Sequence, residues 1–322
     1  MSSVPLLTVK NLTIEFPSSR PVSNLSFELT EGETLAMVGE SGSGKSLTAL
    51  AIMGLLPRSA AISGGQIIFE DSDISKIGAR AMRTLRGKKI SMIFQEPMTS
   101  LNPVMSVGCQ IVEALRQHQS LTRSKARARA IELLDLVRIP APNKRVVSFP
   151  HELSGGMRQR VMIAIAVACE PRLLIADEPT TALDVTIQAQ ILDLLDSLRR
   201  QLSLSILLIT HDLAVVAQRA NRVLVMYAGR KVEEADVEAF VTSPSHPYTR
   251  GLLLASPRSH PNLHYRNARL TEIPGSILSA FGESGCGFRP RCDRALASCA
   301  DQVPELQSVS HQHVVACPYY LD

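Results

Sequence analysis

Eight residues near the amino terminus have the types and the spacing needed to hold a phosphate group. The stretch GESGSGKS, residues 39–46, matches the pattern G-x-x-x-x-G-K-[ST] in full. Its glycines let successive backbone N–H groups face an anion, and a helix expected to begin near Lys45 adds its positive end. The Lys45 ammonium can reach the β- and γ-phosphates of a nucleotide, and the Ser46 hydroxyl can ligate Mg²⁺. The expected nucleotide-binding residues are Gly39, Glu40, Ser41, Gly42, Ser43, Gly44, Lys45 and Ser46.

Two acidic residues at the end of an apolar segment suit the same chemistry. RLLIADEP, residues 172–179, is typical of a buried strand that ends at Asp177 and Glu178. Asp177 suits Mg²⁺, usually through water, and Glu178 can polarise the water that attacks a phosphate. Buried acids are costly unless a metal or hydrogen bonds pair with them, so a purely structural role is the weaker interpretation.

A second anion site is expected where LSGGMRQR, residues 153–160, opens a helix. Ser154, Gly155 and Gly156 would leave bare N–H groups at its amino end. Within a monomer that site is redundant, because the chain has one nucleotide-binding loop. Together with the two motifs above, this stretch makes the chain resemble the ATP-binding subunits of ABC transporters. The family usually has Gln where this chain has Met157, but the backbone amides matter more there than the side chain.

The resemblance implies a fold, cofactors and further site residues. It implies an α/β ABC-type P-loop NTPase core with a helical subdomain, ATP and Mg²⁺ as cofactors, and two such domains paired head to tail. The signature of one domain would then close on the γ-phosphate held by the other. Phe16 would contact adenine, with a core phenylalanine as the competing interpretation. Gln95 would be the Q-loop residue that senses Mg²⁺ and faces the membrane subunits. Asp184 ends the D-loop sequence TALD, and His211 matches the switch histidine that contacts the γ-phosphate.

Two further stretches narrow the resemblance to the oligopeptide, dipeptide and nickel uptake branch. They are FQEPMTSLNP, residues 94–103, and SPSHPYTRGLLLASP, residues 243–257, whose His-Pro-Tyr at 246–248 marks the branch's C-terminal extension. The implied function is the ATP-hydrolysing subunit of a binding-protein-dependent importer. Di- and oligopeptides are the first expectation, and nickel, glutathione and opines are alternatives. Non-transport ABC ATPases usually carry two nucleotide domains or large insertions, and exporter or lipoprotein-release ATPases are not expected to carry this extension.

The same resemblance implies partners and a location. The partners would be a second ATPase subunit (a paralogue or a second copy), two transmembrane permeases and, indirectly, an extracellular solute-binding protein. The chain would lie peripherally on the cytoplasmic face of the inner cell membrane. Its composition agrees, because no apolar run reaches the ~18 residues that a membrane span needs and no signal peptide is recognisable. The net charge of +4 is mild and does not call for nucleic acid.

The elements that must position these residues alternate between strands and helices, as in an α/β core. Strands are expected at residues 33–39, 90–94, 172–177 and 205–210, hairpins at 64–74 and 222–235, and helices at 46–57, 156–169, 186–202 and 212–220, with a helical stretch over 104–138. We expect a nucleotide-binding domain over residues 1–240, with its helical subdomain at about 104–170. A small irregular C-terminal extension over 241–322 follows, where prolines, histidines and glycines become frequent.

The extension also holds four of the six cysteines, with the spacing C-x5-C-x6-C-x17-C. This spacing differs from the C-x2-C pairs of zinc ribbons and from the common ferredoxin patterns. Ordinary buried thiols are therefore the alternative to a metal site. Some members of the uptake branch carry a four-cysteine iron–sulfur site in this extension, so the resemblance implies a [4Fe–4S] cluster, with zinc as the second choice. Its ligands would be Cys286, Cys292, Cys299 and Cys317. Cys109 and Cys169 fall in segments expected to be helical core and are expected to be structural.

Overall fold

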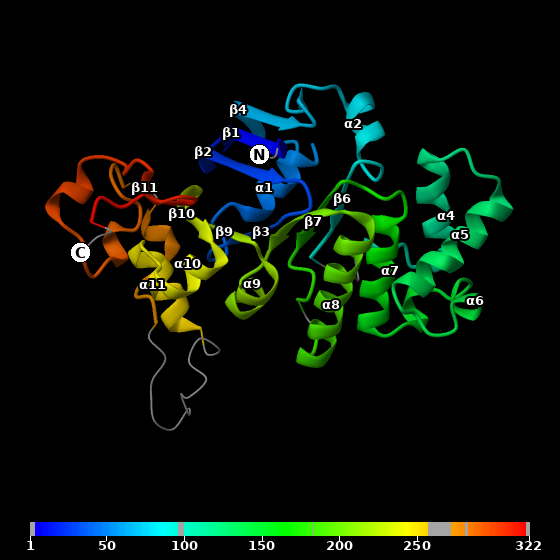
Figure 1. The fold of residues 1–322 in the computed structure, drawn as a ribbon. Coiled ribbons are helices and arrows are strands. Elements are labelled where there is room, and N and C mark those ends of the chain that lie inside the picture. The colour runs from blue at the N-terminus through cyan, green and yellow to red at the C-terminus, as the bar shows by residue number, and fades with distance from the viewer. Residues whose placement is uncertain (1–3, 96–99, 182, 257–271, 281–282, 320–322) are drawn as a thin grey trace. The chain divides into compact units, whose positions relative to one another are not determined.

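Helices and strands are unevenly divided between two units of the chain in a computed structural model (Figure 1). The structure describes residues 4–95, 100–181, 183–256, 272–280 and 283–319. The first unit consists of residues 1–6, 30–33 and 76–207, and the second of residues 7–29, 34–75 and 208–322. The phosphate-loop motif and the carboxy-terminal extension therefore belong to the same unit.

The first unit combines two short parallel strands with a set of helices. Strands β6 (Ile90–Ile93) and β7 (Leu173–Asp177) pair in parallel, and every residue of both is buried. Such fully buried, largely apolar segments are typical of parallel strands that are covered on both faces. The helices are α2 (Ala79–Leu85), α4 (Val107–His118), α5 (Arg123–Leu136), α6 (Pro142–Arg145), α7 (Gly155–Val167) and α8 (Val185–Leu202), with a 3-10 turn at Pro150–Glu152. Strand β8 (Ser205–Ile209) lies where the chain passes from this unit to the second.

The second unit contains an antiparallel sheet near the amino terminus. Its strand order is β2-β1-β4-β5, and β1 pairs with β4 from Leu7 opposite Phe69 to Glu15 opposite Ala61. The strands are β1 (Pro5–Phe16), β2 (Ser19–Thr30), β4 (Ala61–Phe69) and β5 (Ser72–Asp73). The expected hairpin over residues 64–74 is confirmed by the pairing of β4 with β5.

A second set of strands in this unit joins the phosphate loop to the carboxy-terminal extension. The order is β11-β12-β10-β9-β3, with β3 parallel to β9 and the other pairs antiparallel. The strands are β3 (Thr34–Val38), β9 (Arg222–Tyr227), β10 (Arg230–Asp236), β11 (Gln307–Ser310) and β12 (His313–Val315). The helices are α1 (Lys45–Ile52), α9 (Leu213–Arg219), α10 (Val237–Thr242) and α11 (Pro247–Ala255), and 3-10 turns lie at Ile277–Ala280, Arg289–Arg291 and Ala297–Ala300. The extension, coloured from yellow to red in Figure 1, thus adds two strands to the sheet edge at β10.

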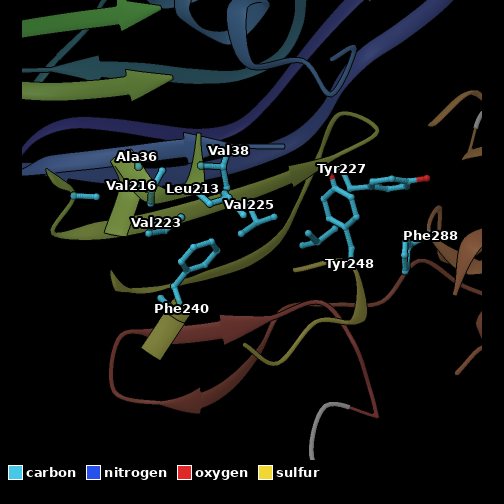
Figure 2. Close-up of a cluster of buried hydrophobic side chains, with 13 residues drawn as sticks. Ala36, Val38, Leu213, Val216, Val223, Val225, Tyr227, Phe240, Tyr248 and Phe288 are labelled. Atoms are coloured by element: carbon cyan, nitrogen blue, oxygen red, sulfur yellow. The ribbon is translucent and has the colours of Figure 1, made fainter. Parts of the chain in front are cut away.

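Aromatic side chains tie the extension to the core of this unit (Figure 2). The Tyr227 ring on β9 lies 4.7 Å from that of Tyr248 on α11 and 5.2 Å from that of Phe288, both edge to face. Phe240 on α10 is fully buried in the same cluster. Aromatic pairs of this kind contribute about 1 kcal/mol each beyond the area they bury. These described parts of the extension are therefore packed on the sheet.

Most expected elements are confirmed within about three residues, with two informative differences. The helix expected over residues 46–57 ends at Ile52, because Gly54 takes a left-handed conformation (φ 60°) and turns the chain before Pro57 is reached. The expectation that Cys109 is a core residue is wrong, since it lies on an exposed face of α4. Cys169 is half-buried just beyond α7. Residues 96–99 of the stretch 94–103 and residue 257 of the stretch 243–257 lie outside the described residues.

Candidate functional site

The phosphate-loop motif forms the turn between β3 and α1 in the second unit. The ammonium of Lys45 is buried and donates to the carbonyl oxygens of Gly39 at 2.7 Å and of Glu40 at 2.8 Å, with the Ser43 hydroxyl at 3.2 Å. The lysine therefore lies over the loop backbone, where a phosphate between the loop and the start of α1 would meet it.

Two glycines of this loop are required by their surroundings. A Cβ at Gly39 would lie 2.2 Å from the carbonyl oxygen of Met226 on β9, and Gly39 also has a positive φ of 147°. A Cβ at Gly44 would lie 2.7 Å from the carbonyl oxygen of Pro21, at a φ of 101°. Both positions therefore exclude any larger residue. The glycine spacing of the motif follows from close packing of the loop on β9 and β2.

Glu40, the second residue of the loop, contacts two residues of the carboxy-terminal extension. Its backbone N–H donates to the hydroxyl of Tyr248 at 2.8 Å. Its carboxylate accepts from the guanidinium of Arg291 at 2.9 Å, and the Arg291 side chain is only 4% exposed. The sequence pattern around Glu40 gives no sign of these contacts. The signals that could have indicated them are the tyrosine of His-Pro-Tyr and Arg291, the second of two arginines between Cys286 and Cys292.

The His-Pro-Tyr sequence forms the capped start of α11. The ring Nδ1 of His246 accepts from the backbone N–H of Tyr248 at 3.0 Å, and Pro247 occupies the first helical turn. Burial lowers the pKa of His246 to about 3, so the ring is neutral and keeps the lone pair that the cap uses. Burial also raises the pKa of Tyr248, which stays protonated.

A buried carboxylate on β10 anchors the start of this turn. Glu233 is fully buried and accepts from the backbone N–H groups of Ser245 at 2.7 Å and His246 at 3.0 Å. Its carboxylate also lies 2.8 Å from the ring Nε2 of His313 on β12. One side chain therefore joins α11 and β12 to the sheet.

The first unit brings together two of the residues expected to act on the attacking water. Glu178 directly follows β7, and its carboxylate accepts from the side-chain amide of Gln95 at 3.0 Å and from the Thr181 hydroxyl at 2.8 Å. Its φ of 46° lies in the left-handed region, which is unusual for glutamate and typical of a strained functional turn. Asp177, the last residue of β7, is 5% exposed.

The signature sequence forms the exposed amino end of α7 in the same unit. Ser154 caps the helix by accepting from the N–H of Met157 at 3.4 Å, and both Ser154 and Gly155 are exposed. A Cβ at Gly156 would lie 2.8 Å from the side chain of Ile187, so this position favours glycine. The end of the helix where an anion would bind is therefore open to solvent within this unit.

The remaining expected site residues lie at the ends of strands and helices. Asp184 caps α8 by accepting from the N–H of Ile187 at 3.0 Å. In the second unit, Phe16 ends β1 and is half-buried, so it is not a core residue. His211 is exposed and lies two residues beyond the end of strand β8. The candidate residues thus divide between the units, with Gln95, Ser154, Gly155, Gly156, Asp177, Glu178 and Asp184 in the first and Phe16, residues 39–46 and His211 in the second.

Comparison with known proteins identifies the family. The chain is 48% identical over 318 residues to a probable peptide ABC transporter ATP-binding protein of Sinorhizobium fredii, covering 97% of this chain and 94% of that protein. It is 47% identical, with the same coverage, to the dipeptide transport ATP-binding protein DppD of Bacillus subtilis. This chain is an ABC transporter ATP-binding subunit. Residues 22–181 match the ABC transporter family model, and residues 232–299 match the model of the oligopeptide/dipeptide transporter C-terminal region.

Solved ABC cassettes share the fold of this ABC subunit. The ATP-binding cassette MJ0796, in a dimeric post-hydrolysis state bound to ADP and Pi, superposes with a TM-score of 0.64 at 26% identity, covering 72% of this chain and 98% of that one. CbiO1 from Clostridium perfringens gives a TM-score of 0.65 at 27% identity, covering 74% and 92%. The expected α/β P-loop NTPase fold is confirmed, and the protein is an ATPase that works with ATP and Mg²⁺. In the part of the chain that the structure describes, no helix is long and apolar enough to span a bilayer.

The four cysteines of this ABC subunit's extension share one small cavity. Cys286, Cys292, Cys299 and Cys317 line a space of about 20 Å³. Burial raises the pKa of Cys286 to about 11, and neighbouring thiols, Cys299 among them, add to the shift. Among the described residues, no three His, Cys, Asp or Glu side chains are arranged to hold a metal ion. The structure therefore does not support the expected iron–sulfur or zinc site.

Proposed function

We propose that this ABC ATPase energises the import of di- or oligopeptides. The relatives quoted above carry peptide or dipeptide transport in their names, and the carboxy-terminal region matches the oligopeptide/dipeptide model over residues 232–299. The domain division that we propose with it is a nucleotide-binding domain over 1–240, with a helical subdomain at about 104–170, and an extension over 241–322. The subunit would lie on the cytoplasmic face of the membrane.

We infer a hydrolytic mechanism in which Glu178 is the general base. The observation that carries it is the position of Glu178 beyond an apolar strand, with Gln95 and Thr181 holding one carboxylate oxygen at 3.0 and 2.8 Å. Lys45 would bind the β- and γ-phosphates, and Mg²⁺ would be held by Ser46, Gln95 and Asp177. His211 would contact the γ-phosphate and Phe16 the adenine.

We also propose a head-to-tail dimer with a paralogue or a second copy. The exposed amino end of α7, with Ser154 and Gly155 open to solvent, supports this arrangement because an anion could reach it from a partner. The solved cassette that it resembles is described as dimeric. Asp184 would lie near the same junction, and two permeases and an external binding protein would complete the importer.

The test of the mechanism is Glu178→Gln. The variant should bind ATP with near-normal affinity but release phosphate at least about 100-fold more slowly, because the base is lost while the phosphate contacts remain. Glu170→Gln is the matched control, since Glu170 pairs with Arg129 at 2.9 Å on an exposed face. Near-normal hydrolysis by Glu178→Gln would reject the assignment.

The transported solute is tested by uptake in a deletion strain. Labelled dipeptides should accumulate with the intact chain and not with Glu178→Gln. Accumulation of nickel or glutathione in place of peptides would overturn the peptide assignment while leaving the ATPase role intact.

We propose that the four extension cysteines act as one thiol site, for which an iron–sulfur cluster is the ligand that the family resemblance implies. The proposal rests on the resemblance and on the gathering of the four thiols around one cavity, since thiolates are the ligands such clusters use. The thiols would have to rearrange around a cluster, because among the described residues they are not arranged to hold a metal ion. Anaerobic purification with iron and sulfide analysis should give about four of each per chain if the cluster is present. Iron-free, colourless protein with a folded extension would count against it, and zinc without sulfide would indicate the second choice.

A further inference from the structure

Glu40 makes hydrogen bonds through three different groups, two of them to the extension and one within the phosphate loop. Its N–H donates to the Tyr248 hydroxyl at 2.8 Å, its carboxylate accepts from Arg291 at 2.9 Å, and its carbonyl accepts from the Lys45 ammonium at 2.8 Å. The residue that holds Lys45 is thus itself held from the extension. We propose that Tyr248 and Arg291 are positioning residues for ATP binding, which act on Lys45 through Glu40. This inference rests on the proposed role of the phosphate loop.

Tyr248 is placed rigidly enough to fix the Glu40 peptide. Its ring is fully buried and lies edge to face against Tyr227, as Figure 2 shows, and its backbone N–H is held by the neutral His246 ring. The hydroxyl is therefore delivered to one point, where it accepts the Glu40 N–H. This explains the three residues together: His246 caps α11, Pro247 fits the first turn, and Tyr248 reaches the loop.

Arg291 has an electrostatic task as well as a geometric one. A carboxylate beside a loop that binds a triphosphate would repel the ligand unless a cation neutralises it. Arg291 supplies that cation from a site where its side chain is 4% exposed, and it is held there by donation to the carbonyl of Pro274 at 2.7 Å. Its guanidinium also lies 3.4 Å from the Tyr227 hydroxyl. The fixed guanidinium thus neutralises the negative charge of Glu40 from outside the nucleotide site.

A purely structural role for Arg291 predicts that its loss affects nucleotide binding no more than the loss of a neighbouring arginine. Arg289, two residues earlier in the same 3-10 turn, pairs with Glu283 at 2.8 Å and so stabilises the extension alone. If arginines of this turn matter only for folding, Arg289 and Arg291 should behave alike. If Arg291 acts on the loop, only its loss should weaken nucleotide binding.

The experiment measures the affinity of the full chain for a fluorescent ATP analogue, together with KM and kcat for Mg-ATP. Arg291→Met should weaken binding and raise KM about tenfold, the loss of one hydrogen bond to a charged group, with kcat within about twofold. Tyr248→Phe should weaken binding about threefold, since it removes one neutral acceptor and keeps the ring. Arg289→Met, the matched control, should bind as wild type, and Arg291→Lys should recover part of the loss.

Charge rescue separates electrostatics from folding. In the Arg291→Met background, Glu40→Gln removes the unpaired carboxylate and should restore affinity to within about threefold of wild type. If Arg291→Met does not fold, by its thermal transition, Tyr248→Phe carries the test. Wild-type-like binding by Arg291→Met and Tyr248→Phe, equal losses in Arg289→Met and Arg291→Met, or no rescue would each overturn the inference. Wild-type chain that binds no ATP would instead refute the proposed role of the loop.

Discussion

The phosphate loop and the carboxy-terminal extension lie in the same unit. The loop is held by contacts between residues close in sequence, whereas the extension is held by contacts between residues far apart. In the loop, Lys45 contacts the carbonyls of Gly39 and Glu40, six and five residues away. In the extension, Arg291 reaches Glu40 across 251 positions, and His313 reaches Glu233 across 80. A local pattern therefore reveals the chemistry, whereas the contacts that support it become visible only in the fold.

The largest loss of stability is expected from removing the Glu233 carboxylate, which holds the extension through long-range contacts. Glu233→Ala leaves the buried N–H groups of Ser245 and His246 and the His313 ring without their acceptor. The free energy of unfolding should fall by about 3 kcal/mol, because each buried donor loses its partner. Denaturant titration of the full chain measures this, and the exposed Glu305→Ala is the control. A loss below about 1 kcal/mol would mean that the extension does not depend on its long-range contacts.

A smaller effect is expected from changing the loop itself at Gly39. In Gly39→Ala the new methyl group would meet the Met226 carbonyl at 2.2 Å, so the loop must move away from β9. We expect a loss of about 2 kcal/mol in unfolding free energy, from the clash and the positive φ together. ATP binding should also weaken, which the fluorescent analogue measures. Gly78→Ala provides the control, since a Cβ there would meet nothing within 4 Å; equal effects at both glycines would show that the loop is not packed as described.

The sequence predicted the chemistry of the site better than its supports. The glycine spacing of residues 39–46 and the apolar run before Asp177 are local patterns with physical causes, and both elements lie where those causes place them. The role of Gln95 followed only from the family resemblance, and its pairing with Glu178, 83 positions away, was not predicted. Its hydrogen bond is a property of the fold that no spacing rule gives.

The extension was harder to predict because its order comes from partners elsewhere in the chain. Prolines and glycines favoured an irregular segment, yet residues 307–310 and 313–315 form strands by pairing with β10. Short strands carry little signal of their own, and the edge that accepts them determines their conformation. Cys109 illustrates the opposite error, since an amphipathic helix does not itself show which of its faces is covered.

The smallest expected effect, the pH dependence due to His246, is the sharpest test of the extension's packing. The pKa of His246 is about 3 in the folded chain and about 6.5 when exposed, so the unfolded state binds the extra proton between these values. Its contribution is therefore fully present above pH 6.5 and is lost as the pH falls toward 3. Protonation would also remove the lone pair that accepts the Tyr248 N–H, so the loss coincides with the loss of the cap.

Between pH 7 and pH 5.5, this group should lower the free energy of unfolding by about 1 kcal/mol, a window above most carboxylate titrations. His246→Asn keeps a side-chain acceptor at the cap but cannot titrate. Between pH 7 and pH 5.5, its free energy of unfolding should therefore fall by about 1 kcal/mol less than that of wild type. His151→Asn, at an exposed position of the first unit, should retain the wild-type pH dependence. If the unfolding free energies of wild type and His246→Asn ran parallel with pH, His246 would be open to water. The tight packing of α11 in the second unit would then be wrong. A steeper loss of stability in wild type than in His246→Asn would show that His246 is buried in solution, and therefore that the extension packs on the unit that holds the phosphate loop.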